Sequence, residues 1–144
     1  MITYHSENIS FNLKGKREIN NWIKSVVSDL QFSLKMSNYK VGDINIVFCN
    51  DTYLLEINQK YLNHNYFTDI ITFDYSENGI ISGDLFISVD TVKENSLKFK
   101  VSFDEEIKRV IIHGVLHLLG YKDKTKSEKL KMKDAENMAL SMIL

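Results

Sequence analysis

The chain has 144 residues, of which 18 are basic and 19 acidic, for a formal net charge of −1. This length fits a single domain with its own core, and the balanced charge excludes attraction to nucleic acid over the whole surface, so any polyanion must be captured by a local patch. No apolar run is long enough to span a membrane, no signal peptide is visible, and the single cysteine, Cys49, excludes an internal disulfide, so we expect a cytoplasmic protein.

The first half of the chain alternates strand-like and helix-like patterns. Residues 2–6 form a short strand, and apolar residues recur at helical spacing from Lys16 to Leu34, which predicts one long helix. Alternating apolar residues predict a strand from Val41 to Cys49. Asp51 is placed to cap a helix that runs to about Leu62.

Two strands and a helix are predicted in the middle of the chain. Residues 68–75 and 84–89 are rich in β-branched and aromatic types. Because the Asn78-Gly79 pair between them favours a chain reversal, we expect the two strands to be antiparallel neighbours. A helix capped by Asp90 follows the second strand.

Two further helices are predicted, each opened by a capping box. Residues 102–105 open the first, which Gly120 ends, and residues 125–128 open the second. The residues of the last helix expected to face inward are Met138, Ala139 and Met142. Together the patterns predict an α+β fold, a single domain over residues 1–144 with a small mixed sheet of about four strands covered by about five helices.

The segment from His113 to Asp123 contains a candidate metal site at the end of the central helix. Residues four apart on a helix are offset by only about 40°, so the imidazoles of His113 and His117 project from one face. Asp123 can join them only if the chain turns back, which Gly120 allows because glycine adopts a positive φ at little cost. Three protein ligands would leave a fourth position for water, which is the pattern of a catalytic zinc site.

A second interpretation of the same residues stays open. Two histidines four apart can simply pack against or cap a helix, and Asp123 can be a turn residue. The pattern also argues against one class of enzyme. Zinc proteases of the His-Glu-x-x-His type have their general base directly after the first histidine, where this chain has Gly114, so peptide hydrolysis by that mechanism is disfavoured.

The stretch His113-Gly-Val-Leu-His117-Leu-Leu-Gly120-Tyr resembles the signature of the YbeY family of bacterial endoribonucleases. Further matches lie upstream in the same order, at Asn58, Tyr61, Thr68-Asp69-Ile-Ile-Thr-Phe73 and Gly83-Asp84-Leu-Phe-Ile87. The resemblance implies a zinc-dependent hydrolase that cleaves phosphodiester bonds in single-stranded RNA during maturation of small-subunit ribosomal RNA. It implies one Zn²⁺ held by His113, His117 and Asp123, with ribosomal RNA or ribosomal particles as partners.

Two positions depart from the family's pattern. Asp123 stands where the family has its third histidine, and a carboxylate oxygen is an acceptable zinc ligand. Leu62 stands where the family has an arginine linked to catalysis, and leucine cannot contact a phosphate. Two alternatives therefore stay open: a non-catalytic ribosome-maturation factor with a structural metal, and a metal-dependent hydrolase of another substrate. No side chain is assigned as general base.

Basic residues near the motif are candidates for substrate binding. Arg109 lies one turn before His113, where it either supplies a cation near the metal or pairs with Glu105 or Glu106. Lys60 and His64 flank Leu62 and are possible substitutes for the missing arginine.

Six lysines follow the metal motif, at positions 122, 124, 126, 129, 131 and 133. Lys122 and Lys124 flank Asp123, so we expect these two to contact the substrate. The last three alternate with acidic residues and are interpreted as a solvated helix face.

Overall fold

The computed structural model describes residues 1–35, 38–63 and 68–143. The strands in these residues are β1 (Ile2–Ser6), β2 (Lys40–Cys49), β3 (Ile70–Asp74) and β4 (Ile80–Ser88). The α-helices are α1 (Lys16–Ser28), α2 (Asp51–Leu62), α3 (Val89–Phe99), α4 (Phe103–Leu118) and α5 (Lys126–Leu140). Within the described ranges this confirms the predicted α+β fold of four strands and five helices.

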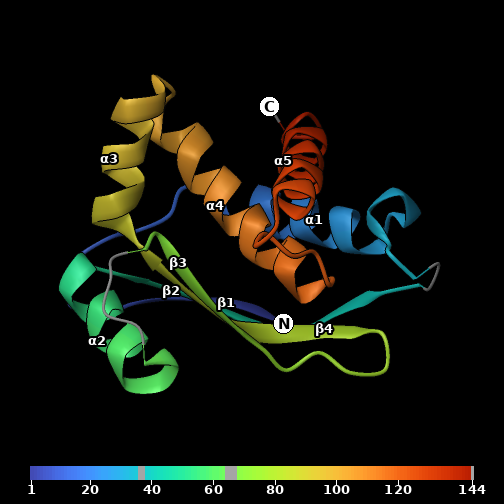
Figure 1. Ribbon diagram of the computed structural model, residues 1–144, viewed down its shortest axis with the longest axis horizontal. Helices are drawn as coiled ribbons and strands as arrows, with labels where there is room; N and C mark the ends of the chain where they lie inside the picture. Colours follow the sequence, from blue (N-terminus) through green and yellow to red (C-terminus); the bar gives the residue numbers. More distant parts are fainter. Residues whose placement is uncertain (36–37, 64–67, 144) are drawn as a thin grey trace.

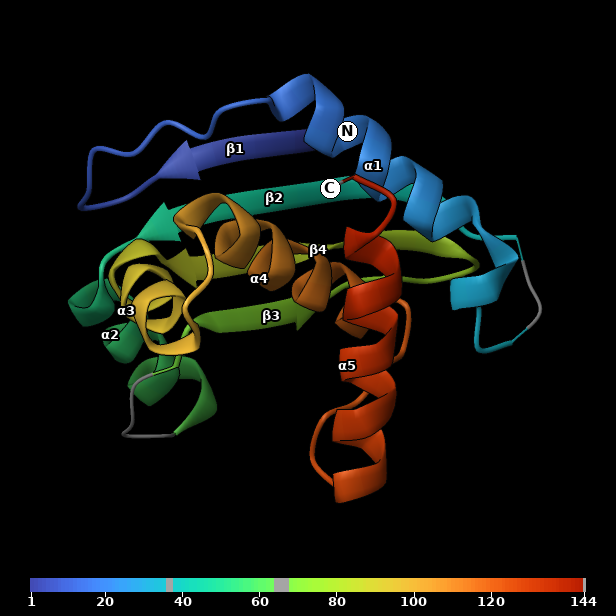
Figure 2. The same ribbon diagram turned by 90° about the horizontal axis from the view of Figure 1, so that it is seen from above.

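The four strands form one mixed sheet in the order β1-β2-β4-β3. β1 runs parallel to β2 and β2 parallel to β4, whereas β3 is antiparallel to β4, with Ile71 opposite Phe86. The predicted antiparallel pair is therefore confirmed. Figure 2 shows β1 and β3 at the two edges of the sheet, with α4 lying across it.

The helices are divided between the two faces of the sheet. α1, α4 and α5 lie on one side, where the main core includes Ile46, Leu85 and Ile111, all fully buried (Figure 1). α2 lies on the other side and covers a smaller apolar cluster that includes Leu54 and Ile71. α5 packs on α4, and the indole of Trp22 on α1 donates a hydrogen bond to the carbonyl of Ala139 at 2.8 Å.

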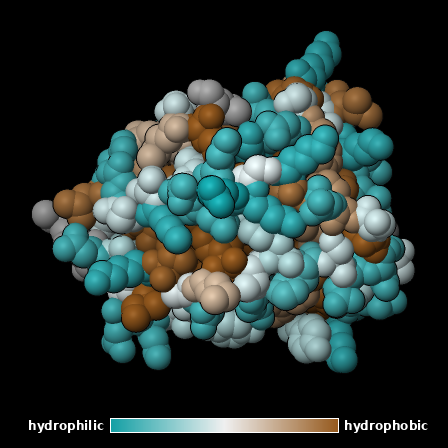
Figure 3. All heavy atoms as spheres, turned by 180° about the vertical axis from the view of Figure 1, so that it is seen from behind, coloured by the Kyte–Doolittle hydropathy of each residue, from teal (hydrophilic) through white to brown (hydrophobic). Residues whose placement is uncertain are grey.

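Polar side chains cover most of the molecular surface that Figure 3 draws. The face behind the view of Figure 1 is mainly hydrophilic, and its apolar side chains gather only in small patches (Figure 3). Among the described residues, no helix is both long and apolar enough to cross a membrane.

The predicted helix from Lys16 to Leu34 is too long. It ends at Ser28, because Asp29 takes an extended conformation and its carboxylate accepts a hydrogen bond from the backbone of Gln31, which starts a short 3-10 helix. Leu30 and Leu34 continued the apolar pattern, but they are 60% and 50% exposed. The aspartate thus stops the helix before its apolar pattern ends.

The predicted caps of α2 and α3 are also wrong by one and two residues. The caps are Asn50 and Ser88, whose side chains accept hydrogen bonds from the third backbone N–H of each helix. Asp51 instead accepts hydrogen bonds from the hydroxyls of Ser88 and Thr91. Asp90 accepts one from the backbone N–H of Asp51 at 3.2 Å. The two aspartates therefore join the starts of two helices instead of capping them.

The inward face of α5 differs from the prediction. Ala139 is buried as expected, but Met138 and Met142 are 44% and 41% exposed. The buried residues of the helix are Met132, Ala135, Glu136, Ala139 and Leu140. A carboxylate therefore lies within the inward stripe, which is why hydropathy alone gave the wrong phase.

Candidate metal centre

Helix α4 carries the two histidines and crosses the sheet closely. The side chain of Ser102 caps the helix by accepting from the backbone N–H of Glu105, which is one half of the predicted capping box. Both bonds of the box predicted at residues 125–128 are present, between Thr125 and Glu128. A Cβ at Gly114 would lie 2.8 Å from the side chain of Ile70 on β3 and 3.0 Å from that of Leu85 on β4. Glycine at this position thus lets α4 approach β3 and β4, which brings the neighbouring His113 close to the edge strand.

The end of α4 has the hydrogen bonds of a Schellman motif. The backbone N–H of Gly120 donates to the carbonyl of His117 and that of Tyr121 to the carbonyl of Leu116, both at 3.0 Å. Gly120 has a φ of +104°, a conformation that residues with a Cβ rarely adopt. The chain therefore reverses where the sequence predicted.

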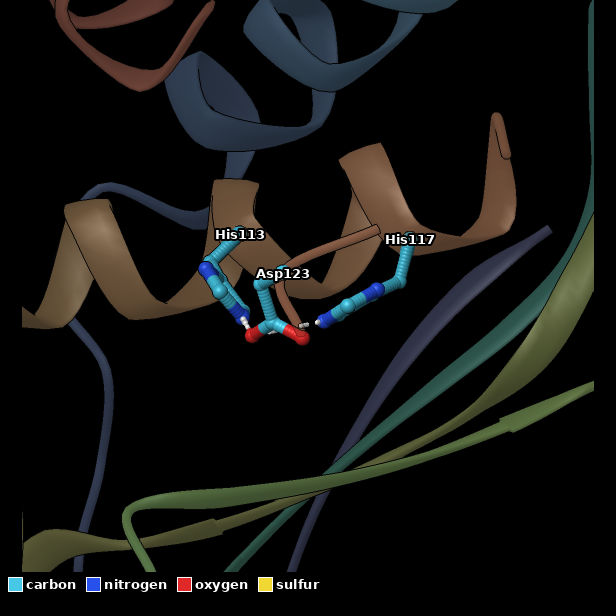
Figure 4. Close-up of side chains that lie close together, drawn as sticks. All are labelled: His113, His117 and Asp123. Atoms are coloured by element: carbon cyan, nitrogen blue, oxygen red, sulfur yellow. Dashed lines mark ion pairs between the residues drawn. The ribbon is translucent and has the colours of Figure 1, made fainter. Parts of the chain in front are cut away.

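The reversal brings together the three side chains of the predicted site. Oδ2 of Asp123 lies 3.3 Å from Nε2 of His113 and 3.4 Å from Nε2 of His117. In Figure 4 the two rings and the carboxylate point toward one another from α4 and from the loop that follows it. One ligand atom from each residue lies within 4.8 Å of the others, so the group could hold a metal ion.

The other nitrogen of each ring is also engaged. Nδ1 of His117 lies 2.9 Å from the carbonyl oxygen of Tyr121, and Nδ1 of His113 lies 2.6 Å from Oε2 of Glu136 on α5. Since a carbonyl and a carboxylate accept hydrogen bonds, each Nδ1 carries the proton and each Nε2 is directed to the cluster. Two Nε2 atoms whose rings are oriented by these contacts, with a carboxylate oxygen beside them, are ligand types that fit a zinc-type metal ion.

Arg109 acts on this cluster through Glu136. Its Nη1 lies 2.9 Å from Oε1 of Glu136 and its Nη2 lies 2.8 Å from Oδ1 of Asn137. In the described part of the chain its ion pair is therefore with α5, and the alternative pairing with Glu105 or Glu106 is wrong. Both oxygens of Glu136 are engaged, one by Arg109 and one by His113.

The two histidines are in different electrostatic environments. Burial alone lowers the pKa of His113, but the hydrogen bond and charge of Glu136, with the charges of Asp69 and Asp123, outweigh burial and raise that pKa above its usual value. Burial and the neighbouring His113 lower the pKa of His117. His113 therefore holds a proton more readily than His117 does.

Glu106 is a functional candidate that the sequence analysis missed. It is only 4% exposed, and burial together with the charge of Asp69 raises its pKa to about 7, although Arg109 opposes the shift. Two turns of helix separate Glu106 from His113, so both lie on one face of α4. That spacing was a usable signal, but the residue was considered only as a partner for Arg109.

A groove of about 610 Å³ opens beside the edge strand β3 and includes all three members of the cluster. We call it the β3 groove; its other lining residues include Asn58, Leu62, Asp69, Ile70, Thr72 and Lys124. The structure therefore places Leu62 and Lys124 at the candidate site. Lys122 lines a neighbouring recess with Lys124, His117 and Asp123.

The proposed substitutes for the arginine lie differently. The ammonium of Lys60 lies 5.3 Å from the centre of the Tyr61 ring on α2. Lys60 is exposed and is not part of the lining of the β3 groove. His64 lies outside the described residues.

The chain resembles known proteins over its whole length. The model of the family described as Endoribonuclease YbeY matches residues 2–143. The protein named Endoribonuclease YbeY from Flavobacterium psychrophilum is 46% identical over 142 residues, which cover 99% of this chain and 96% of the relative. The protein of the same name from Bacteroides fragilis is 48% identical over 141 residues, which cover 98% and 96%.

The fold also has a counterpart among solved structures. The solution structure of TM1509 from Thermotoga maritima matches with a TM-score of 0.60 and 23% identity, covering 99% of this chain and 91% of that one. This likeness supports the fold, whereas the family model and the relatives decide the family. From the match over residues 2–143 and identities near one half, the chain belongs to the YbeY family.

Proposed function

We propose that the protein is a zinc-dependent endoribonuclease that acts in maturation of small-subunit ribosomal RNA in the cytoplasm, with one Zn²⁺ held by His113, His117 and Asp123. The observation that carries the proposal is the convergence of three ligand atoms within 4.8 Å, with both Nδ1 atoms already engaged. The relatives named Endoribonuclease YbeY support RNA as the substrate. Ribosomal RNA or ribosomal particles as partners follow from the same resemblance.

In this proposal the residues of the chain bind the metal ion, orient its ligands and contact the RNA. His113 and His117 present Nε2 to the ion, and Glu136 and the Tyr121 carbonyl fix the orientation of the rings. Lys124, at the rim of the β3 groove, and the nearby Lys122 supply positive charge for RNA phosphates. When bound, the zinc ion supplies a Lewis acid that polarises a phosphoryl oxygen and makes a water more acidic.

Leu62 changes how this site contacts RNA, compared with a site that has an arginine at this position. It is 40% exposed and lines the β3 groove, where it offers apolar contact and no charge. The cationic contacts in this proposal therefore come from the lysines after α4, because leucine cannot stabilise charge on a phosphate.

Elemental analysis of the purified protein, followed by cleavage of a structured ribosomal RNA fragment, tests the proposal. We expect about one zinc per chain and cleavage that a chelator abolishes and added zinc restores. Asp123→Asn should remove both zinc and cleavage. Asp134→Asn, the same change at an exposed position of α5, should keep both. Zinc-loaded protein that loses stability with the chelator but never cleaves RNA would contradict the enzymatic role.

A further inference from the structure

A second groove also reaches the cluster and is lined by other elements than the β3 groove. It has a volume of about 500 Å³ and is lined by α4, by α5 and by the segment between α3 and α4. We call it the α5 groove. Figure 2 shows α3 and α5 near opposite ends of α4. The lining residues come mainly from the end of α3, from α4 and from α5. His113 and Asp123 line both grooves, so the two meet at the proposed metal ligands.

An open path on both sides of the cluster matters for the reaction proposed above, on which this inference rests. An endonuclease cuts within a chain, so nucleotides must be accommodated on each side of the reacting phosphodiester. The β3 groove accounts for one side only. The α5 groove is lined by other elements and reaches the same cluster, as does the recess lined by Lys122 and Lys124.

Two of the three cations that line the α5 groove, Lys129 and Lys133, lie on one face of α5, and the third, Arg109 on α4, is paired with Glu136. Lys129 and Lys133 are four residues apart on the helix, so their side chains project from the same face, and both are exposed. Neither takes part in an ion pair among the described residues. Two free ammonium groups spaced along a groove are suited to successive phosphates of a nucleic acid strand.

The far end of the groove is apolar and aromatic. Phe99, the last residue of α3, is 56% exposed and lines the groove together with Val101. The ammonium of Lys98 lies 5.8 Å from the centre of the Phe99 ring, which adds a cation at this end. An exposed aromatic ring beside cations is the usual platform on which proteins stack an unpaired base.

Two of the four acidic residues in the groove contribute little negative charge to it. Glu136 is occupied by Arg109 and His113. Glu106 is buried, and its pKa of about 7 leaves it partly protonated near neutrality. Glu105 and Asp123 remain as carboxylates in the lining, and Asp123 is one of the proposed metal ligands. A bound divalent ion would add further positive charge where the two grooves meet.

We infer that the α5 groove is a nucleotide-binding subsite for the RNA on one side of the reacting phosphodiester, with Lys129 and Lys133 contacting phosphates and Phe99 stacking on a base. The three lysines at positions 129, 131 and 133, which the sequence pattern indicated as a solvated face, therefore have different roles. Lys129 and Lys133 bind RNA, whereas Lys131 points away from the groove, because it lies about 200° around the helix from Lys129.

Binding of a short fluorescein-labelled single-stranded RNA to the full chain, measured by anisotropy in chelator so that no cleavage occurs, tests the subsite. Lys129→Gln/Lys133→Gln should weaken binding roughly tenfold and reduce the salt slope of log K by about 1.4, the value for two phosphate contacts on a single strand. Lys131→Gln is the matched control on the same helix and should leave binding unchanged. Each single variant, Lys129→Gln or Lys133→Gln, should weaken binding more than this control does. Phe99→Ala should weaken binding several-fold without changing the salt slope.

The outcomes separate this inference from the proposed function. If the native chain binds and cleaves RNA but the double variant binds as Lys131→Gln does, the α5 groove is not a subsite and the proposed function stands. If the native chain neither binds nor cleaves RNA, the proposed function and the subsite both fail. Unchanged circular dichroism and melting temperature of each variant exclude unfolding as the cause of weaker binding.

Discussion

His113 and His117 lie one turn apart on α4, yet different parts of the molecule hold them. His117 donates to the carbonyl of Tyr121, four residues further along, within the turn that ends the helix. His113 donates to Glu136, 23 residues away on α5. One ring is therefore fixed by local chain geometry and the other by the packing of two helices.

The difference teaches that a set of proposed metal ligands contained in one short segment can still depend on a distant element. If α5 moved away from α4, His117 would keep its partner, but His113 would lose Glu136 and Arg109 would lose both of its partners. We therefore expect changes at the α4–α5 contact to affect the proposed metal centre through His113. Changes at the turn should act through His117 and Asp123.

The largest expected effect comes from Glu136→Gln, which keeps the size of the side chain but removes its charge. Loss of the carboxylate partner of a histidine ligand weakens metal binding by about 10–100-fold. Competition with a zinc-binding dye measures the affinity. Asn137→Ala, which removes the other α5 partner of Arg109, is the control and should change zinc affinity much less. Equal zinc affinity in the two variants would show that α5 does not hold His113.

The next effect tests the turn. Gly120→Ala places a Cβ on a residue with a φ of +104°, where only ordinary contact with Leu34 is near, so the cost is backbone strain of about 1–2 kcal/mol. Urea unfolding in chelator measures that loss. Gly15→Ala is the control, since Gly15 has a φ of +72°, open space around it and no contact with the cluster.

The two glycine variants should lose similar stability, but only Gly120→Ala should also lose zinc affinity. The reason is that the turn places both the Tyr121 carbonyl and Asp123. If both variants retained native zinc affinity, the turn would not position the ligands.

Local features were predictable from the sequence, and the distant contact was not. The i,i+4 spacing of His113 and His117 and the glycine at 120 fix the convergence on Asp123 with little help from other elements. Glu136 was missed because its contact depends on how α5 docks on α4. An acid inside an apolar stripe also shifted the predicted inward face of that helix.

The sheet shows the same division. The antiparallel pair of β3 and β4 was predictable because a short reversal joins the two strands. The position of β4 between β2 and β3 was not, since it depends on long crossovers that no local pattern specifies. The helix caps show it too. Asn50 and Asp51 are both suitable cap residues for α2, and Asn50 is the cap because the carboxylate of Asp51 is engaged by the hydroxyls of Ser88 and Thr91.

The smallest effect expected from the comparison is a difference in titration in the metal-free protein. Because the pKa of His113 is raised and that of His117 is lowered, ring NMR signals should show His113 titrating above the usual value of about 6.5 and His117 below it. For His113, the stability gained from protonation is complete below the unfolded pKa and is lost as pH rises through the raised folded pKa. For His117 the sign is opposite, and stability is lost as pH falls through the unfolded pKa toward the lowered folded one. Glu136→Gln should lower the pKa of His113 toward that of His117. Coincident titration of the two rings in the native protein would mean that Glu136 does not make their pKa values differ.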